Sequence, residues 1–492
     1  MILPKVSFSL LLAISLLFCP LSSGKPINTD ALTRAILDLG ETFPETYAKA
    51  GLFLERLRTL EASDGDTGLE QLQREALLAN PLLDFEELLV LRRSDKSPAL
   101  GLPTNWQGNC SLPAGAYRNK IIALSMNNPA GKYRTVFRPD ENVYVGDVDL
   151  DFDAQRLLFS MPDENQRWHV WEKDLQSGLL SKLTPADDPD VDNYDACYLP
   201  DGRIVYASTA CYTGIPCVFG GSNVANLCVI NRDGTGLRQL CFDQDHNWSP
   251  VVMHDGRVMY QRWEYSDLPH SNSRLLFSMN PDGTAQMELY GSNSYWPNSI
   301  FYARPVPGHP TMFAGIVTGH HGARRMGELV LFDPAKGRHE ADGVVQRIPG
   351  YGEKVEPIFK DRLVDDSWPK FLHPWPLSDK YFLVASQPTP KSRWGIYLVD
   401  VFDNMVLLRE DPGYALFQPI PFRKRPTPPV IPSKIDLDQR TALVYLSDLY
   451  IGTGLAGVPK GTIKSLRLFT YTYGYRGMCR LLGTIGMDGP WD

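Results

Sequence analysis

One phrase recurs through residues 141–422 of this 492-residue chain: two short apolar strands joined by a tight turn. It reads VDLDFDAQRLLFSM, ACYLPDGRIVYAST, SPVVMHDGRVMYQRW, ARPVPGHPTMFAGIV and HPWPLSDKYFLVAS. A third apolar strand follows each phrase after a polar loop, for example NLCVINRDG or GIYLVDVFD. Asp and Gly at the turns suit the positive φ angles of short hairpins. A unit of this kind must bury one face against its neighbour, so the repetition predicts a chain of packed antiparallel sheets.

The repeated strand order favours a mainly β fold, a six-bladed β-propeller with four strands in each blade. Five units are explicit, and ALFQPIPF with strands elsewhere would complete a sixth. A β-sandwich is the alternative, but a sandwich does not require the same strand order to repeat. We therefore predict a propeller with a small N-terminal helical region and a short C-terminal β segment.

Composition changes along the chain divide it into predicted regions. Residues 25–140 form an N-terminal helical or mixed region, with helical periodicity in ALTRAILDLGETF and YAKAGLFLERLRTLEA. The propeller follows over 141–422, and the Pro-rich RKRPTPPVIPSK makes 423–436 a stiff linker. Residues 437–492 are expected to form a C-terminal β segment, which ends abruptly enough to suggest truncation.

The first 24 residues have the layout of a cleavable signal peptide. Lys5 precedes the apolar run SFSLLLAISLLF, and small residues follow at Ser22 and Gly24. The run is shorter than the roughly 18 residues that a membrane span needs, so we expect a periplasmic or secreted protein without a transmembrane span. The net charge of −8 argues against a general nucleic-acid binder, and 43% hydrophobic residues suffice for a sizeable core.

Seven cysteines remain after the predicted cleavage, and an odd number leaves at least one thiol unpaired, metal-bound or joined to another chain. The sequence contains no CxxCH, so it predicts no covalent haem in this chain. Cys228 and Cys241 flank a hairpin-like segment and are candidates for a disulfide.

Metal-ligating residue types fall in loops that a propeller would bring to one end of its central channel. The loops after the second strand and before the first strand of each unit hold Cys211, Cys217, His246, His270, His320 and His321. Thiolate and imidazole groups suit zinc, copper or iron, so a zinc site is a hypothesis here. Two alternatives stay open: a disulfide between Cys211 and Cys217, and simple hydrogen bonding of the histidines to loop backbone.

No motif of a catalytic centre is present. GxSxG, HExxH and phosphate-binding loops are all absent, so no catalytic residue and no cofactor-binding residue is predicted and enzyme activity stays open. A ligand- or partner-binding module is the first expectation. A component of a redox enzyme, completed by a separate haem-bearing subunit or cytochrome, is the second.

Longer strings resemble exported bacterial proteins related to the hydrazine synthase alpha subunit, and the DG-turn units resemble the TolB-type (PD40-like) repeat. These strings cover roughly residues 80–492, and they include CYLPDGRIVYASTAC, DQDHNWSPVV, GSNSYWPNSIFYARPVPG, GIVTGHHGARRMGELVLFD and GYALFQPIPFRKRPTPPVIP. The resemblance implies a six-bladed propeller in the middle of the chain, c-type haems, a zinc ion near the active-site haem and a multi-subunit complex that makes hydrazine. Because CxxCH is missing, hydrazine synthesis is not expected of this chain by itself.

Overall fold

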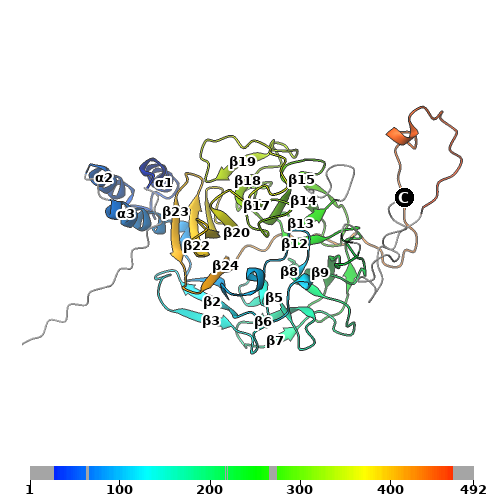
Figure 1. The fold of residues 1–492 in the computed structure, drawn as a ribbon, viewed down its shortest axis with the longest axis horizontal. Helices are drawn as coiled ribbons and strands as arrows, with labels where there is room; N and C mark the ends of the chain where they lie inside the picture. Colours follow the sequence, from blue (N-terminus) through cyan, green and yellow to red (C-terminus); the bar gives the residue numbers. More distant parts are fainter. Residues whose placement is uncertain (1–26, 63–65, 216–217, 219, 265–273, 469–492) are drawn as a thin grey trace, which may run out of the picture.

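The structure is a computed structural model that describes residues 27–62, 66–215, 218, 220–264 and 274–468. Its strands form five sheets arranged around a common centre (Figure 1). Four sheets have four strands and the fifth has eight. The expectation of a mainly β, propeller-like fold is therefore confirmed, while the separate four-stranded sheets number four rather than six.

Three of the four-stranded sheets follow the chain strand by strand. The first contains β4 (Gly146–Leu150), β5 (Arg156–Pro162), β6 (Trp168–Asp174) and β7 (Leu180–Lys182). The second contains β8 (Asn193–Tyr198), β9 (Ile204–Ser208), β10 (Asn226–Ile230) and β11 (Arg238–Gln239). The third contains β20 (Lys370–Pro376), β21 (Tyr381–Gln387), β22 (Gly395–Asp400) and β23 (Met405–Arg409).

The eight-stranded sheet consists of two runs of four strands. One run contains β12 (Asn247–Val252), β13 (Val258–Trp263), β14 (Arg274–Met279) and β15 (Met287–Tyr290). The other contains β16 (Ser299–Pro305), β17 (Phe313–Thr318), β18 (Glu328–Phe332) and β19 (Val344–Ile348). Within each run the pairing is antiparallel, whereas the two runs meet at the single parallel pair Arg274 and Ser299. The sheet therefore repeats the four-strand order of its neighbours twice.

The fourth four-stranded sheet joins the two ends of the ring. It contains β1 (Glu87–Ser94), β2 (Asn119–Ser125), β3 (Tyr133–Phe137) and β24 (Tyr414–Pro421), in the order β24-β1-β2-β3. Residues before the boundary predicted at 141 thus belong to the ring. The sequence could not reveal this, because β1 and β24 are far apart along the chain.

The predicted hairpin turns form where Asp-Gly pairs stand. Gly202 and Gly256 both have a φ of 86°, a left-handed conformation that glycine adopts without strain. The strand that follows the turn at Gly202, β9, is buried at every position, so both of its faces are covered. The turns therefore form where predicted, while burial in this strand is not limited to alternate positions.

Three helices precede the ring: α1 (Thr29–Thr42), α2 (Ala50–Glu61) and α3 (Asp66–Leu78). They lie beside the sheet that contains β22 and β23 (Figure 1). Asn28 caps α1 by accepting from the Ala31 N–H, and the Asn404 amide donates to the Ala31 carbonyl at 2.8 Å. Among the described residues no helix is long and apolar enough to cross a membrane.

Short 3-10 helices occur outside the sheets, namely η1 (Pro81–Leu83), η2 (Pro98–Gly101), η3 (Asn109–Ser111) and η6 (Thr453–Leu455).

Residues after β24 contain no strand as far as residue 468. The predicted C-terminal β segment is therefore not seen in its described part. Leu443 and Tyr445 are exposed, since no neighbouring strand covers the apolar side chains of TALVYL.

Candidate functional site

Each strand nearest the centre of the ring carries a β-bulge. β4, β8, β12, β16, β20 and β24 all shift register against their partner strand. One residue in each bulge has a positive φ between 48° and 55°, which is uncommon outside glycine. These six residues, here named the channel ring, are Asp147, Asp195, Ser249, Tyr302, His373 and Gln418.

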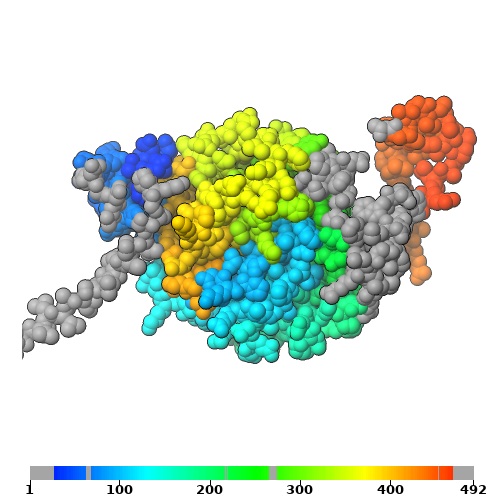
Figure 2. Space-filling model, in the orientation of Figure 1, coloured from blue at the N-terminus to red at the C-terminus, as the bar shows by residue number. Residues whose placement is uncertain are grey.

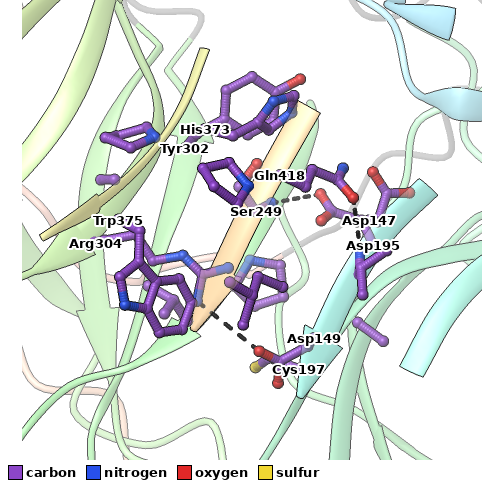
Figure 3. Close-up of a pocket in the computed structure, with 18 residues that line it drawn as sticks. Asp147, Asp149, Asp195, Cys197, Ser249, Tyr302, Arg304, His373, Trp375 and Gln418 are labelled. Atoms are coloured by element: carbon purple, nitrogen blue, oxygen red, sulfur yellow. Dashed lines mark hydrogen bonds and ion pairs between the residues drawn. The ribbon is translucent and has the colours of Figure 1, made fainter. Parts of the chain in front are cut away.

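The channel ring lines a cavity at the centre of the molecule (Figure 3). The cavity has about 600 Å³ of space, part of it open to solvent. Residues two positions further along the same strands complete the wall, namely Asp149, Cys197, Val251, Arg304, Trp375 and Ile420. Polar groups that converge on one central cavity are typical of a small-molecule site.

Two carboxyl groups lie side by side in the channel ring. Asp147 accepts from the Asn109 amide at 2.5 Å, and Asp195 accepts from the Ser249 N–H at 2.7 Å. Burial, followed by the negative charge of Asp147, raises the pKa of Asp195 to about 7. Burial also raises the pKa of Asp147. The pair therefore holds a proton near neutral pH, and one carboxyl can then donate a hydrogen bond.

Aromatic groups form another part of the channel ring. The rings of Tyr302 and His373 have their centres 4.2 Å apart. Burial, followed by the positive charges of Arg93, Arg304 and Arg325, holds the pKa of His373 well below its usual value. His373 is therefore neutral, and its Nδ1 has no hydrogen-bond partner among the described residues.

Two guanidinium groups meet a single carboxylate beyond the channel ring. The Nη1 atom of Arg304 and the Nη2 atom of Arg425 each lie 3.9 Å from Oδ1 of Asp149. The indole ring of Trp375 lies beside both, with its centre 5.1 Å from Cζ of Arg304 and 5.4 Å from Cζ of Arg425. Asp149 lies further along β4 than Asp147. The cluster of Asp149, Arg304 and Arg425 is therefore on the side of the channel ring where the innermost strands end.

The other side of the channel ring is filled by the chain between β1 and β2. Asn105 donates to the Gly319 carbonyl at 2.5 Å, and Arg325 donates to the Gln107 carbonyl at 2.5 Å. Figure 2 shows this blue segment in the middle of the face. The sequence predicted a site at this end of the channel, in the loops that follow the second strands. The chain between β1 and β2, which has no propeller repeat, fills that end, and the cavity described above lies on the opposite side of the channel ring.

His320 and His321, predicted as metal ligands, meet a third donor. Together with Asp361 they offer ligand atoms that all lie within 4.8 Å of one another. Nδ1 of His321 lies 2.9 Å from the Asp361 carboxylate, while Nδ1 of His320 contacts the guanidinium of Arg274. Burial, then the Arg274 charge, lowers the pKa of His320 to about 2. A neutral His320 that accepts from Arg274 carries its proton on Nε2, so neither nitrogen is free to bind a metal in this arrangement.

The other predicted donors do not join that group. His246 is fully buried and its Nδ1 accepts from the Ala225 N–H at 3.0 Å. The Cys211 thiol donates to the Val224 carbonyl at 3.4 Å. Cys217 and His270 lie outside the described residues.

The cysteines considered as disulfide candidates are free where the structure describes them. Cys211, Cys228 and Cys241 are free thiols. The suggested bridge between Cys228 and Cys241 is therefore not formed. The pairing of Cys211 with Cys217 concerns a residue outside the described part of the chain.

None of the predicted metal ligands belongs to the channel ring, although one signal in the sequence points to the ring. Ser249, His373 and Gln418 are each followed by proline in the middle of an innermost strand. Proline inside a strand is confined to edges and bulges. Three prolines at the same position of the repeat therefore mark the bulge, and residues one position earlier could have been taken as lining the channel.

Comparisons with known proteins support the fold alone. No family model and no curated protein matches the sequence. Among solved structures, Kuenenia stuttgartiensis hydrazine synthase is similar with a TM-score of 0.53 and 14% identity, over 70% of this chain and 48% of that chain. TolB from Acinetobacter baumannii is similar with a TM-score of 0.43 and 10% identity, over 72% of this chain and 71% of that chain.

A putative TolB from Agrobacterium tumefaciens is similar with a TM-score of 0.35 and 13% identity, over 54% of this chain and 90% of that chain. This chain spans about half the length of the hydrazine synthase chain that it matches. The sheets therefore form a propeller-like fold, with hydrazine synthase among its structural neighbours.

Proposed function

We propose that this chain is an exported ligand-binding β-propeller, similar in fold to the middle domain of the hydrazine synthase alpha subunit, and that it takes a small molecule into its channel cavity. The proposal counts the eight-stranded sheet as two blades, which gives six. The observation that carries it is the channel ring, in which six equivalent bulges aim polar or aromatic side chains into one cavity. A strained backbone conformation costs free energy, and such positions cluster at functional sites. Strain at six matched positions therefore supports a functional role for the channel ring.

The mixture of groups in the cavity supports a binding role. Carboxyls, a neutral imidazole, an amide and a guanidinium meet there beside the rings of Tyr302 and Trp375. Ligand sites commonly combine apolar and aromatic walls with a few polar groups that fix orientation. In this proposal the chain has no haem of its own, and a haem-bearing partner remains part of the alternative below.

The proposal is tested by filling the cavity. Ala303 is buried and lines the cavity, so Ala303→Phe would occupy the space that a ligand needs. A panel of small fragments is screened against the full chain by saturation-transfer NMR, with unchanged circular dichroism as the check of folding. Fragments that bind the wild type and are lost in Ala303→Phe support the proposal.

A second filled-cavity variant, Val251→Phe, covers the case in which Ala303→Phe does not fold. Leu237→Phe is the matched surface control, because Leu237 is exposed and lies outside the cavity. The cavity is not the ligand site if no fragment binds the wild type or the control. The same conclusion follows if fragments bind equally well to the wild type and to both cavity variants.

A second candidate function is a redox component with a metal ion at His320, His321 and Asp361. Two imidazoles and a carboxylate are a ligand set for zinc or non-haem iron. Binding would require Arg274 to move away from Nδ1 of His320. Elemental analysis of the purified protein with an optical spectrum tests it: stoichiometric metal lost in His321→Ala supports the site, and metal-free protein rejects it.

A further inference from the structure

We infer that the ligand of the channel cavity is a small organic anion whose carboxylate binds between the guanidinium groups of Arg304 and Arg425. This inference rests on the function proposed above and names the ligand class for the same cavity. It assigns a role to a residue outside the propeller repeats, since Arg425 belongs to the Pro-rich segment after β24.

The guanidinium groups at this end of the cavity are only loosely paired with the nearby carboxylates, of which Asp149 and Asp151 both act on Arg425. Two guanidinium groups share one carboxylate oxygen of Asp149, and both distances, 3.9 Å, exceed a good charge-assisted hydrogen bond. Nε of Arg425 is buried without a partner among the described residues. Guanidinium groups bind planar carboxylates through paired hydrogen bonds, so donors left without acceptors here fit a ligand carboxylate.

Arg425 is held in position by the propeller. Its backbone N–H donates to the Phe152 carbonyl at 2.8 Å, and its guanidinium donates to the Leu150 carbonyl. The aromatic rings of Phe152 and Trp375 lie beside the guanidinium, with centres 5.0 Å and 5.4 Å from Cζ. The side chain is therefore fixed before a ligand arrives, which lowers the entropic cost of binding.

The segment that carries Arg425 is seated along the turns of the propeller. A Cβ atom at Gly256 would lie 2.1 Å from the Pro429 carbonyl oxygen, so the segment approaches this turn as closely as glycine allows. The Lys434 N–H donates to Asp282 at 2.7 Å. Residues 425–434 thus run from the β4–β5 turn to the blade of β12–β14, and they place Arg425 beside Asp149, which lines the cavity.

The remaining walls suit the body of such a ligand. Tyr302 and Trp375 offer aromatic surface, and Asp147 with Asp195 offers carboxyl groups at the far end of the cavity (Figure 3). An aromatic acid with a polar group opposite its carboxylate would meet each of these features. We therefore choose 4-hydroxybenzoate as a probe and 4-hydroxybenzamide, which lacks only the negative charge, as its neutral counterpart.

The test measures the dissociation constants of both probes by isothermal titration calorimetry with the full chain. We expect 4-hydroxybenzoate to bind at least about tenfold more tightly than the amide, because a hydrogen bond to a charged group contributes more than a neutral one. Arg304→Gln and Arg425→Gln should each weaken the acid by about tenfold or more and leave the amide nearly unchanged. Arg423→Gln, an exposed arginine of the same segment, is the matched control and should change neither.

The outcomes separate this inference from the proposed function. Equal binding of acid and amide, abolished by Ala303→Phe, overturns the anion inference while the cavity remains a ligand site. Acid binding that persists in both arginine variants, or that is insensitive to Ala303→Phe, also overturns it. Absence of acid binding to the wild type rejects the inference outright, and the fragment panel then decides on the cavity separately. Arg425→Lys replaces Arg425→Gln if the latter does not fold.

Discussion

Individual buried polar residues near the channel affect the stability of the fold and its dependence on pH. Asp245 is 1% exposed, and neither of its carboxylate oxygens has a hydrogen-bond partner among the described residues. Burial raises its pKa to about 7 against the opposing charge of Arg274. A buried carboxyl without hydrogen bonds is costly to ionise, so Asp245 links folding to pH.

We predict that Asp245→Asn removes part of the pH dependence of stability. Between the usual carboxyl pKa of about 3.9 and the folded-state value of about 7, the folded state retains a proton that the unfolded state releases. The free energy of unfolding therefore falls as pH rises through this window and becomes flat above it. Urea unfolding at pH 5 and pH 8 should show a smaller loss in Asp245→Asn than in the wild type.

Asp187→Asn, at an exposed position, is the control for that experiment and should follow the wild type. Identical pH dependence in the wild type and Asp245→Asn would mean that Asp245 is ionised in the folded protein at both pH values.

Asn105 provides a second prediction, because it ties the segment between β1 and β2 to the channel. Its amide donates to the carbonyls of Gly319 and Ala323, and its oxygen accepts from the Arg325 N–H. Asn105→Ala should lower the free energy of unfolding by about 1–3 kcal/mol, since it leaves buried partners unsatisfied. Urea unfolding checks this, with exposed Asn127→Ala as control; equal stability of the two variants would contradict the account.

At the scale of elements, the sequence predicted what depends on neighbours along the chain. Hairpins such as β8–β9 and β12–β13 follow from Asp-Gly turns and apolar alternation, which are local properties. The pairing of β24 with β1 was not predictable, because nothing local distinguishes NPLLDFEELLVLRR as a strand rather than a helix end. The strand-like TALVYL remains extended for a related reason: alternation specifies a strand only where a partner can cover it.

Closure of the ring by β24 leads to the third prediction. Phe417 is fully buried in β24, with its ring centre 5.8 Å from that of His373 and 5.6 Å from that of Trp394. Phe417→Ala should lower the free energy of unfolding by about 3–5 kcal/mol, the usual cost of a large core truncation. Phe242→Ala, at a side chain that is 78% exposed, should change it by less than about 0.5 kcal/mol. A loss below about 1 kcal/mol for Phe417→Ala in urea unfolding would mean that β24 is not needed for closure.

The attachment of the helices leads to the fourth prediction. Asn404 donates to the Ala31 carbonyl in α1 at 2.8 Å and accepts from Gln73 in α3 at 3.2 Å. Asn404→Ala should therefore increase amide hydrogen exchange in α1 and α3 and leave β8–β10 unchanged. Exposed Asn165→Ala is the control. Unchanged exchange in both helices would show that apolar packing alone holds them to the sheet of β20–β23.

In the whole molecule, the repeated strand-turn-strand unit predicts the architecture, whereas the candidate site forms where side chains from different units meet. The repeated phrase was sufficient for a propeller, because each unit needs a neighbour to cover its apolar face. The cavity is lined by side chains that come from six strands between residues 146 and 421, and Arg425, beyond the last strand, lies beside Asp149 of this wall. The sequence does not reveal the distances between these side chains. The prediction therefore relied on metal-ligating residue types in loops, which lie at the opposite end of the channel.

A crystal structure of the full chain soaked with 4-bromobenzoate would show directly where the ligand binds, because the anomalous signal of bromine locates it. We expect a bromine peak inside the cavity, with the carboxylate between Arg304 and Arg425. A cavity that holds only water, with bromine absent or found elsewhere on the molecule, would overturn the proposed site.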